Sequence, residues 1–154
     1  MKTAVSIVVV LLLLLVVPKS SFGQFSLGVS VVHPVGRLEP IQNNGLGIDG
    51  RYDLGIHRGL KFSFVGAYYS LPAQHYLLTQ VGLKCYFTGG SRGFYGGVDF
   101  GNYNRISTER SLSYLGYAPG LGYRFRRIDL SGRLNVVGTP QQSEFMTYRL
   151  AIVF

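Results

Sequence analysis

The chain has 154 residues, of which 47% are hydrophobic and 14% are charged, with a formal net charge of +8 and a single cysteine. This length fits one domain. One cysteine excludes an intramolecular disulfide framework, and because Cys85 does not directly follow a leader segment, the chain lacks the acylation site of a lipoprotein.

The N-terminal segment has the pattern of a cleaved export signal. Lys2 precedes an apolar run over residues 4–17, and Ser21 and Gly23 supply the small side chains that a signal peptidase requires. The run is shorter than the roughly 20 residues that a spanning helix needs. We therefore expect a signal peptide over residues 1–23, export by the Sec pathway and a mature domain over 24–154. An uncleaved N-terminal anchor is the alternative.

The basic character of the chain persists after removal of this signal. Without Lys2 and Lys19, 13 of the 15 basic residues remain against seven acidic ones, a net charge of +6. Such a balance is typical of nucleic-acid binding. Export and the scattering of the basic residues along the chain argue against that function, and Cys85 is best explained as an apolar wall residue.

Eight segments of the mature chain alternate between apolar and polar residues, which is the period of a strand with two different faces. Each exceeds the usual five or six residues of a soluble strand and suits the roughly 9 to 11 residues of a tilted membrane-spanning strand. The 21 glycines and the abundant Tyr, Phe and Val disfavour helices. The expected strands are 24–33, 44–54, 59–70, 76–87, 93–104, 112–125, 127–137 and 144–154.

The two faces of these strands differ in chemistry. In each strand, one set of alternate residues carries no charge and many large apolar side chains. The other set combines charged residues with glycine, alanine and serine. An eight-stranded barrel is only just wide enough inside for side chains, so we expect the small and charged face to line the lumen. The outward set is Phe25, Leu27, Val29, Val31, Leu46, Ile48, Tyr52, Leu60, Phe62, Phe64, Tyr68, Val81, Leu83, Cys85, Phe87, Phe94, Val98, Phe100, Leu115, Tyr117, Leu121, Tyr123, Phe125, Ile128, Leu130, Leu134, Val136, Tyr148, Leu150, Ile152 and Phe154.

Charges on the inward face must be paired, because an unpaired charge is costly to bury. The expected pairs join Asp49, Asp99 and Asp129 to Arg51, Lys84, Arg124, Arg133 and Arg149. Other polar or small inward residues are Lys61, Gln80, Asn135, Gly28, Ser30, Ser63, Gly97, Gly101, Gly116, Ala118, Gly120 and Gly122.

Outward aromatic residues form two belts, as at the two edges of a membrane-spanning barrel. The expected periplasmic connections are 54–58, 88–92 and 126–127, and the outer loops are 34–43, 71–75, 104–111 and 137–143. The denser belt comprises Phe25, Tyr52, Phe62, Phe87, Phe94, Tyr123, Phe125 and Phe154, and the thinner one Tyr68, Phe100, Tyr117 and Tyr148.

The last strand places Tyr148, Leu150, Ile152 and Phe154 on one face and ends on an aromatic residue, which resembles the C-terminal assembly signal of outer-membrane barrel proteins. The mature chain as a whole resembles the small eight-stranded outer-membrane β-barrel proteins of Gram-negative bacteria. Residues 81–87 and 94–98 resemble the barrel-domain families common in Bacteroidetes. The resemblance implies an all-β, antiparallel up-and-down transmembrane barrel, inserted by the barrel-assembly machinery through the strand ending at Phe154, monomeric and in contact with outer-membrane lipid and lipopolysaccharide.

No catalytic, cofactor-binding or metal-ligating residues are expected. His33, His57 and His75 lack the serine two positions away that a lipid-A deacylase would use, and a charged lumen does not suit a palmitoyl-transferase. We expect no enzymatic activity and a structural or surface-interaction role in the outer membrane.

Two other functions remain open at this point. If the apolar face instead lined the cavity and the charged face pointed outward, the chain would be a secreted soluble calycin-like barrel that binds a small apolar ligand. With an open lumen, Arg124, Arg133 and Arg149 would line a narrow anion-selective pore. On the outside, Arg105, Glu109 and Arg110 form the charged cluster singled out for surface interaction, with a solvated loop tip as the simpler explanation.

Overall fold

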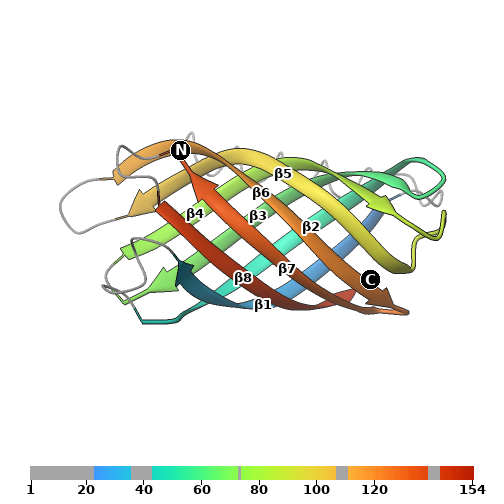
Figure 1. Cartoon of the computed structure of the whole chain (residues 1–154), viewed down its shortest axis with the longest axis horizontal. Coiled ribbons are helices and arrows are strands. Elements are labelled where there is room, and N and C mark those ends of the chain that lie inside the picture. The colour runs from blue at the N-terminus through green and yellow to red at the C-terminus, as the bar shows by residue number, and fades with distance from the viewer. Residues whose placement is uncertain (1–22, 36–42, 73, 107–110, 139–142) are drawn as a thin grey trace, which may run out of the picture.

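The computed structural model describes residues 23–35, 43–72, 74–106, 111–138 and 143–154. Within these ranges, eight antiparallel strands close into one barrel in which each strand pairs with its sequence neighbours and β8 pairs with β1 (Figure 1). This confirms the expected fold class. The strands are β1 (Gly23–Val35), β2 (Gly45–His57), β3 (Leu60–Leu71), β4 (Gln74–Tyr86), β5 (Gly93–Ile106), β6 (Ser111–Phe125), β7 (Ile128–Val137) and β8 (Ser143–Val153).

All eight expected strands are present, with ends that differ from the expected ones by three residues or fewer. The largest extension is in β2, which continues past Leu54 to His57 through an irregularity in its pairing with β3. The predicted signal peptide lies outside the described residues except for Gly23, which already pairs with Leu54. None of the described segments is a helix long and apolar enough to cross a membrane.

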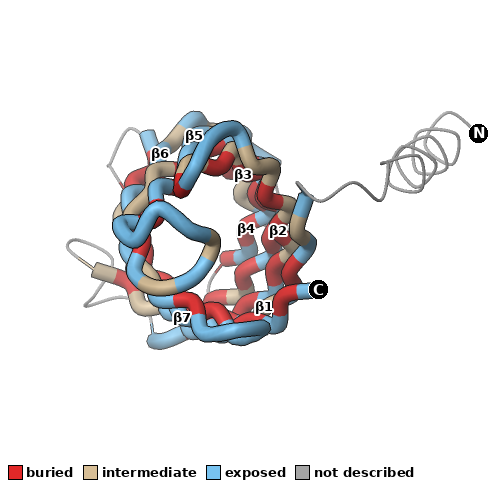
Figure 2. Tube along the Cα trace, turned by 90° about the vertical axis from the view of Figure 1, so that its right-hand side faces the viewer, coloured by how far each residue is buried: buried red, intermediate tan, exposed pale blue. Residues whose placement is uncertain are grey.

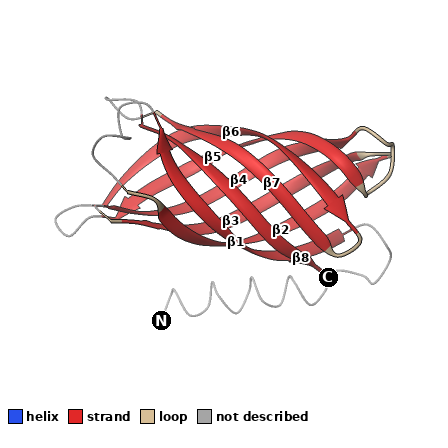
Figure 3. Cartoon of the chain, turned by 60° about the horizontal axis from the view of Figure 1, so that its bottom comes forward, coloured by secondary structure: helices blue, strands red, loops and turns tan. Residues whose placement is uncertain are grey.

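The strands are tilted against the barrel axis (Figure 3), as closure of a barrel requires. Pairing of β1 with β8 matches Ser30 with Arg149 and Gly28 with Ala151, so no strand edge is left open. The ladder between β6 and β7 omits Ala118 and Pro119, and a proline has no amide hydrogen to donate.

We call the end of the barrel that holds the start of β1 and the end of β8 the terminal end, and the other end the loop end. The connections at the terminal end are tight. Gly59 and Gly89 adopt positive φ values of 75° and 67°, and Arg126 does so at 51° in the two-residue connection to β7. Arg127 accepts a backbone hydrogen bond from Val153 at 2.7 Å, which ties this turn to the last strand.

The aromatic residues of both predicted belts lie on the outside of the wall. At the terminal end, the rings of Phe25 and Phe154 stack at 6.3 Å, and those of Phe94 and Tyr123 lie 4.6 Å apart. In the thinner set, the rings of Phe100 and Tyr117 lie 6.4 Å apart, and Tyr68 stacks on the ring of His75 at 5.9 Å. The contacts Phe25–Phe154, Phe94–Tyr123 and Phe100–Tyr117 each join belt residues of neighbouring strands.

Candidate functional site

The outer wall of the barrel is an apolar band. Its side chains are exposed or half-buried, with Leu115 at 77% and Leu46 at 70%, and Cys85 is exposed among them. Figure 2 shows the alternation of buried and exposed residues around the wall. The exception among the expected outward residues is Val136, which is 8% exposed between Tyr117 and Glu144.

An apolar surface that surrounds the whole barrel is far larger than the few hundred Å² that soluble monomers expose. The band therefore belongs in lipid, and the barrel is a transmembrane one. The alternative of a soluble calycin-like barrel with the opposite parity is wrong, because the large apolar set of β8, including Leu150 and Ile152, points outward.

The middle of the lumen contains a network of paired charges. Asp99 Oδ2 accepts hydrogen bonds from Arg51 at 2.8 Å and from Arg133 at 2.9 Å. Arg149 donates to Asp49 at 2.5 Å and contacts Asp129 at 3.3 Å. All of these side chains are buried, so cross-lumen pairing is confirmed for all three expected carboxylates, Asp49, Asp99 and Asp129.

Pairing at the terminal end of the lumen differs from the expectation. Lys84 pairs with Asp53 at 2.7 Å, a residue that the sequence analysis left out of the network. Arg124 has no carboxylate partner within the described residues; it donates to Gln24 Oε1, which also accepts from Lys61. The alternation of residues along a strand assigns these side chains to the lumen. Which partner each one can reach depends on its height along the barrel axis.

Toward the loop end, the lumen is filled by an apolar plug, which the sequence analysis missed. Tyr69, Tyr76 and Tyr103 surround Phe145, whose ring lies 5.9, 5.5 and 6.2 Å from theirs. All four side chains have a relative exposure of 0%. The remaining plug residues are Val32, Ala67, Leu71, Leu78 and Val137.

A signal for this plug was present in the sequence. Near the loop end, adjacent apolar residues interrupt the alternation at Val31-Val32, Tyr68-Tyr69, Leu77-Leu78 and Val136-Val137, although such pairs also occur elsewhere, as at Phe64-Val65 and Phe94-Tyr95. The second residue of each of the four loop-end pairs belongs to the plug. Two adjacent apolar residues in a strand indicate that both faces are apolar at that height.

Polar groups connect the plug to the charged network. Gln80 donates to the Tyr103 hydroxyl at 2.6 Å, and Tyr103 donates to Asn135 at 3.0 Å. A cavity of about 10 Å³ lies beside Arg51, Asp99 and Arg133, which is room for about one water molecule. Side chains thus fill the lumen from the plug to the ion pairs of Asp99.

The other candidate residues do not assemble into a reactive site. His33 Nδ1 lies 2.6 Å from Asn44 Oδ1 at the loop end, and His57 is exposed at the end of β2. The described residues contain no group of three or more potential metal ligands. Arg105 is half-buried on β5, whereas Glu109 and Arg110 of the proposed surface cluster lie outside the described residues.

Comparison with known proteins identifies the fold. No protein-family model and no curated protein sequence matches the chain. Among solved structures, the N-terminal β-barrel domain of Pseudomonas aeruginosa OprF is similar with a TM-score of 0.58 and 13% identity, covering 85% of this chain and 97% of that one.

Two further structures have the same fold. The outer membrane protein Ail of Yersinia pestis in a phospholipid bilayer nanodisc gives a TM-score of 0.59 at 11% identity, with 86% and 99% of the two chains covered. Neisserial surface protein A gives 0.52 at 13% identity, with 87% and 98% covered. The chain therefore has the fold of eight-stranded outer-membrane barrels along almost the whole length of each of these three.

Proposed function

We propose that this protein is an integral outer-membrane protein whose closed, non-conducting barrel has a structural or surface-interaction role without catalysis. The observation that carries the proposal is the combination of an apolar outer band with a lumen blocked by the plug around Phe145. The three similar barrels, two of them described as an outer membrane protein and a surface protein, support this location.

Export by the Sec pathway and insertion by the barrel-assembly machinery belong to the same proposal. The strand ending at Phe154 would be the segment that the machinery engages, and Phe154 donates a backbone hydrogen bond to Phe25 at 2.8 Å, next to the closing seam. With the terminal end in the periplasm, the monomer would present its outer loops to lipopolysaccharide and the surroundings of the cell.

The plug argues against the narrow pore. Arg133 and Arg149 are neutralised by buried carboxylates, and an ion crossing the lumen would have to displace Tyr69, Tyr103 and Phe145. Eight strands leave no continuous aqueous channel once side chains fill the interior. We expect planar bilayers containing the protein to show no discrete conductance steps.

Two measurements test the proposal. Membranes washed with alkaline carbonate should retain the protein, and its electrophoretic mobility in SDS should change on boiling. Release into the wash without a mobility shift would contradict the membrane location. Anion-selective conductance steps in planar bilayers would instead contradict the closed lumen and support the narrow pore. A variant with Tyr76→Ala, Tyr103→Ala and Phe145→Ala provides a control in which three of the four aromatic side chains of the plug have been truncated.

A further inference from the structure

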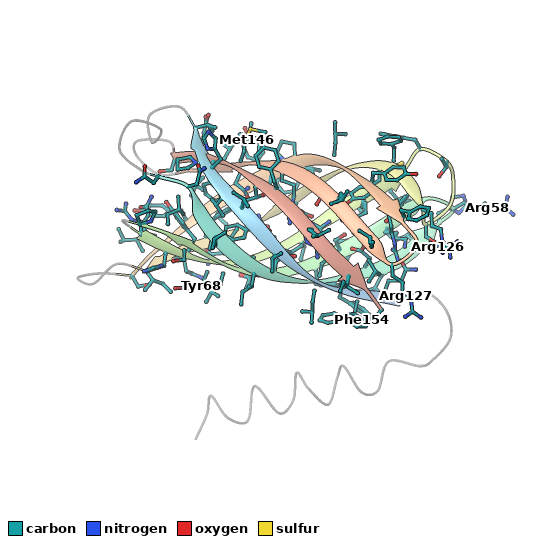
Figure 4. The ribbon with its side chains drawn as sticks, turned by 90° about the horizontal axis from the view of Figure 1, so that it is seen from below. Arg58, Tyr68, Arg126, Arg127, Met146 and Phe154 are labelled. Atoms are coloured by element: carbon teal, nitrogen blue, oxygen red, sulfur yellow. The ribbon has the colours of Figure 1, made fainter. Side chains whose placement is uncertain are left out.

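Every connection at the terminal end carries exposed arginine. Arg58 lies between β2 and β3, Arg92 between β4 and β5, and Arg126 and Arg127 between β6 and β7. Figure 4 shows Arg58, Arg126 and Arg127 at the same end of the barrel as Phe154, away from Tyr68 and Met146. None of the three connections contains an acidic residue. We call these four side chains the arginine rim.

The adjacent lumen does not neutralise the rim. Lys61 and Arg124, both 6% exposed, donate to the same uncharged acceptor, Gln24 Oε1. The carboxylates of the described lumen nearest this end are already engaged, Asp53 by Lys84 and Asp129 by Arg149. The terminal end therefore has a surplus of positive charge in both its turns and its mouth.

The rim lies directly beside exposed apolar side chains of the band. Phe87 and Phe94 flank the connection that holds Arg92 and are 68% and 65% exposed. The Arg126 guanidinium lies 5.5 Å from the ring centroid of Phe125, which is 56% exposed. Aromatic belts mark the boundary of the hydrocarbon layer, so guanidinium groups just beyond them are at the depth of lipid headgroups.

The turn at Arg126 is an unfavourable place for arginine. Its φ of 51° is the left-handed conformation, for which two-residue hairpin turns prefer Asn or Gly. An arginine there is strained relative to those residues. A turn that only connects two strands does not explain an arginine at this position, whereas a charged contact made by its side chain does.

We propose that the arginine rim binds the headgroups of anionic phospholipids in the leaflet at the terminal end. Guanidinium groups form charge-assisted hydrogen bonds with phosphate oxygens, and an uncompensated positive end favours lipids with net negative charge over zwitterionic ones. The inference rests on the proposed membrane location and, in the cell, would make the rim a contact with the periplasmic leaflet.

The sequence segments that join strands at the other end have a different charge pattern. They contain Arg37, Arg105 and Arg110 interspersed with Glu39 and Glu109, and of these residues only Arg105 lies within the described ranges. A preference for anionic lipid that came from overall net charge would depend equally on both ends. A preference that comes from the rim depends on the terminal end alone, and this difference makes the proposal testable with matched variants.

The test measures which lipids remain bound to the full-length protein. The protein is reconstituted into vesicles of equimolar phosphatidylethanolamine and phosphatidylglycerol and extracted in mild detergent, and the retained lipids are quantified by mass spectrometry. The main variant is R58Q/R92Q/R126N/R127Q, in which asparagine tolerates the positive φ at 126. The pair R126N/R127Q is matched in charge by the loop-end pair R37Q/R110Q.

We expect the unaltered protein to retain more phosphatidylglycerol than phosphatidylethanolamine. The enrichment should fall by about fivefold or more when the rim is removed, since each basic residue near an anionic surface contributes about 1 kcal/mol. R126N/R127Q should lose part of the enrichment and R37Q/R110Q none. Equal enrichment in the rim variant and the unaltered protein, or equal losses in the two charge-matched pairs, would overturn the proposal.

Two controls separate the possible failures. Heat-modifiable mobility identifies variants that have folded, and loss of membrane retention in the unaltered protein would be a failure of the proposed function itself. If the fourfold rim variant does not fold, the comparison of R126N/R127Q with R37Q/R110Q still decides the question, and the salt dependence of the unaltered protein adds a second test. Its enrichment in phosphatidylglycerol should decrease as salt is raised, because exposed charges are screened over about 10 Å at 0.1 M, and enrichment independent of salt would refute the rim as its cause.

Discussion

Arg149 is the residue whose replacement tests the lumen network most directly. Its guanidinium lies 2.5 Å from Asp49 and 3.3 Å from Asp129, and it donates to the Ser26 hydroxyl at 2.9 Å. In R149M the two carboxylates stay buried, with Ser30 donating to Asp49 and Tyr95 to Asp129. Removal of one partner from a buried ion pair destabilises a protein by about 3 to 5 kcal/mol.

The expected loss corresponds to an increase in the unfolding equilibrium constant by roughly two to three and a half powers of ten. Because the chain contains no tryptophan, the folded fraction is best followed by electrophoretic mobility without boiling, across a urea series in lipid vesicles. The midpoint and slope of that transition give the free energy of unfolding.

A compensated variant distinguishes loss of pairing from loss of packing. In R149M/D49N/D129N no buried carboxylate loses its cation, so most of the stability should return. R58Q, in an exposed turn, should change stability by no more than about 0.5 kcal/mol. A loss below about 1 kcal/mol in R149M, or a triple variant no more stable than R149M, would refute the argument that charge pairing in the lumen supports the fold.

Four further variants test the packing of the wall and the lumen by the same urea series. Phe145→Ala should destabilise the barrel by about 3 to 5 kcal/mol because it empties the centre of the plug; a loss below about 1 kcal/mol would indicate that the plug is loosely packed. Gly101→Ala should be strongly destabilising because its Cβ would clash with the Thr79 carbonyl oxygen, whereas Gly66→Ala meets nothing within 4 Å and should be tolerated. Equal effects of the two alanine substitutions would contradict this packing. Leu150→Arg introduces a charge into the outward band and should cost about 2 to 4 kcal/mol if that position is near the bilayer midplane; an unchanged midpoint in vesicles would place Leu150 outside the hydrocarbon layer.

Period-two alternation was sufficient to predict the wall of this protein. It located all eight strands, and it assigned Phe25 and Leu150 to the outside and Asp49 and Arg149 to the lumen. The reason is that consecutive side chains of a strand point to opposite faces. A difference in chemistry between the two faces therefore appears as alternation along the sequence.

The same alternation predicted the lumen only in part. It implied that Asp99 must be paired, and two arginines meet it. It did not identify the pairing of Asp53 with Lys84, and the aromatic plug was missed because inward residues were assessed by polarity and not by their height along the barrel.

The sequence by itself determined which face of each strand meets lipid and which meets the lumen, because that choice depends on local alternation and side-chain volume. Only the tertiary structure decided which inward residues touch. Phe145 and Tyr69 come from β8 and β3, and Arg51 and Asp99 from β2 and β5. Their contacts depend on strand register and tilt around the closed wall, which are properties of the whole barrel and of no single strand.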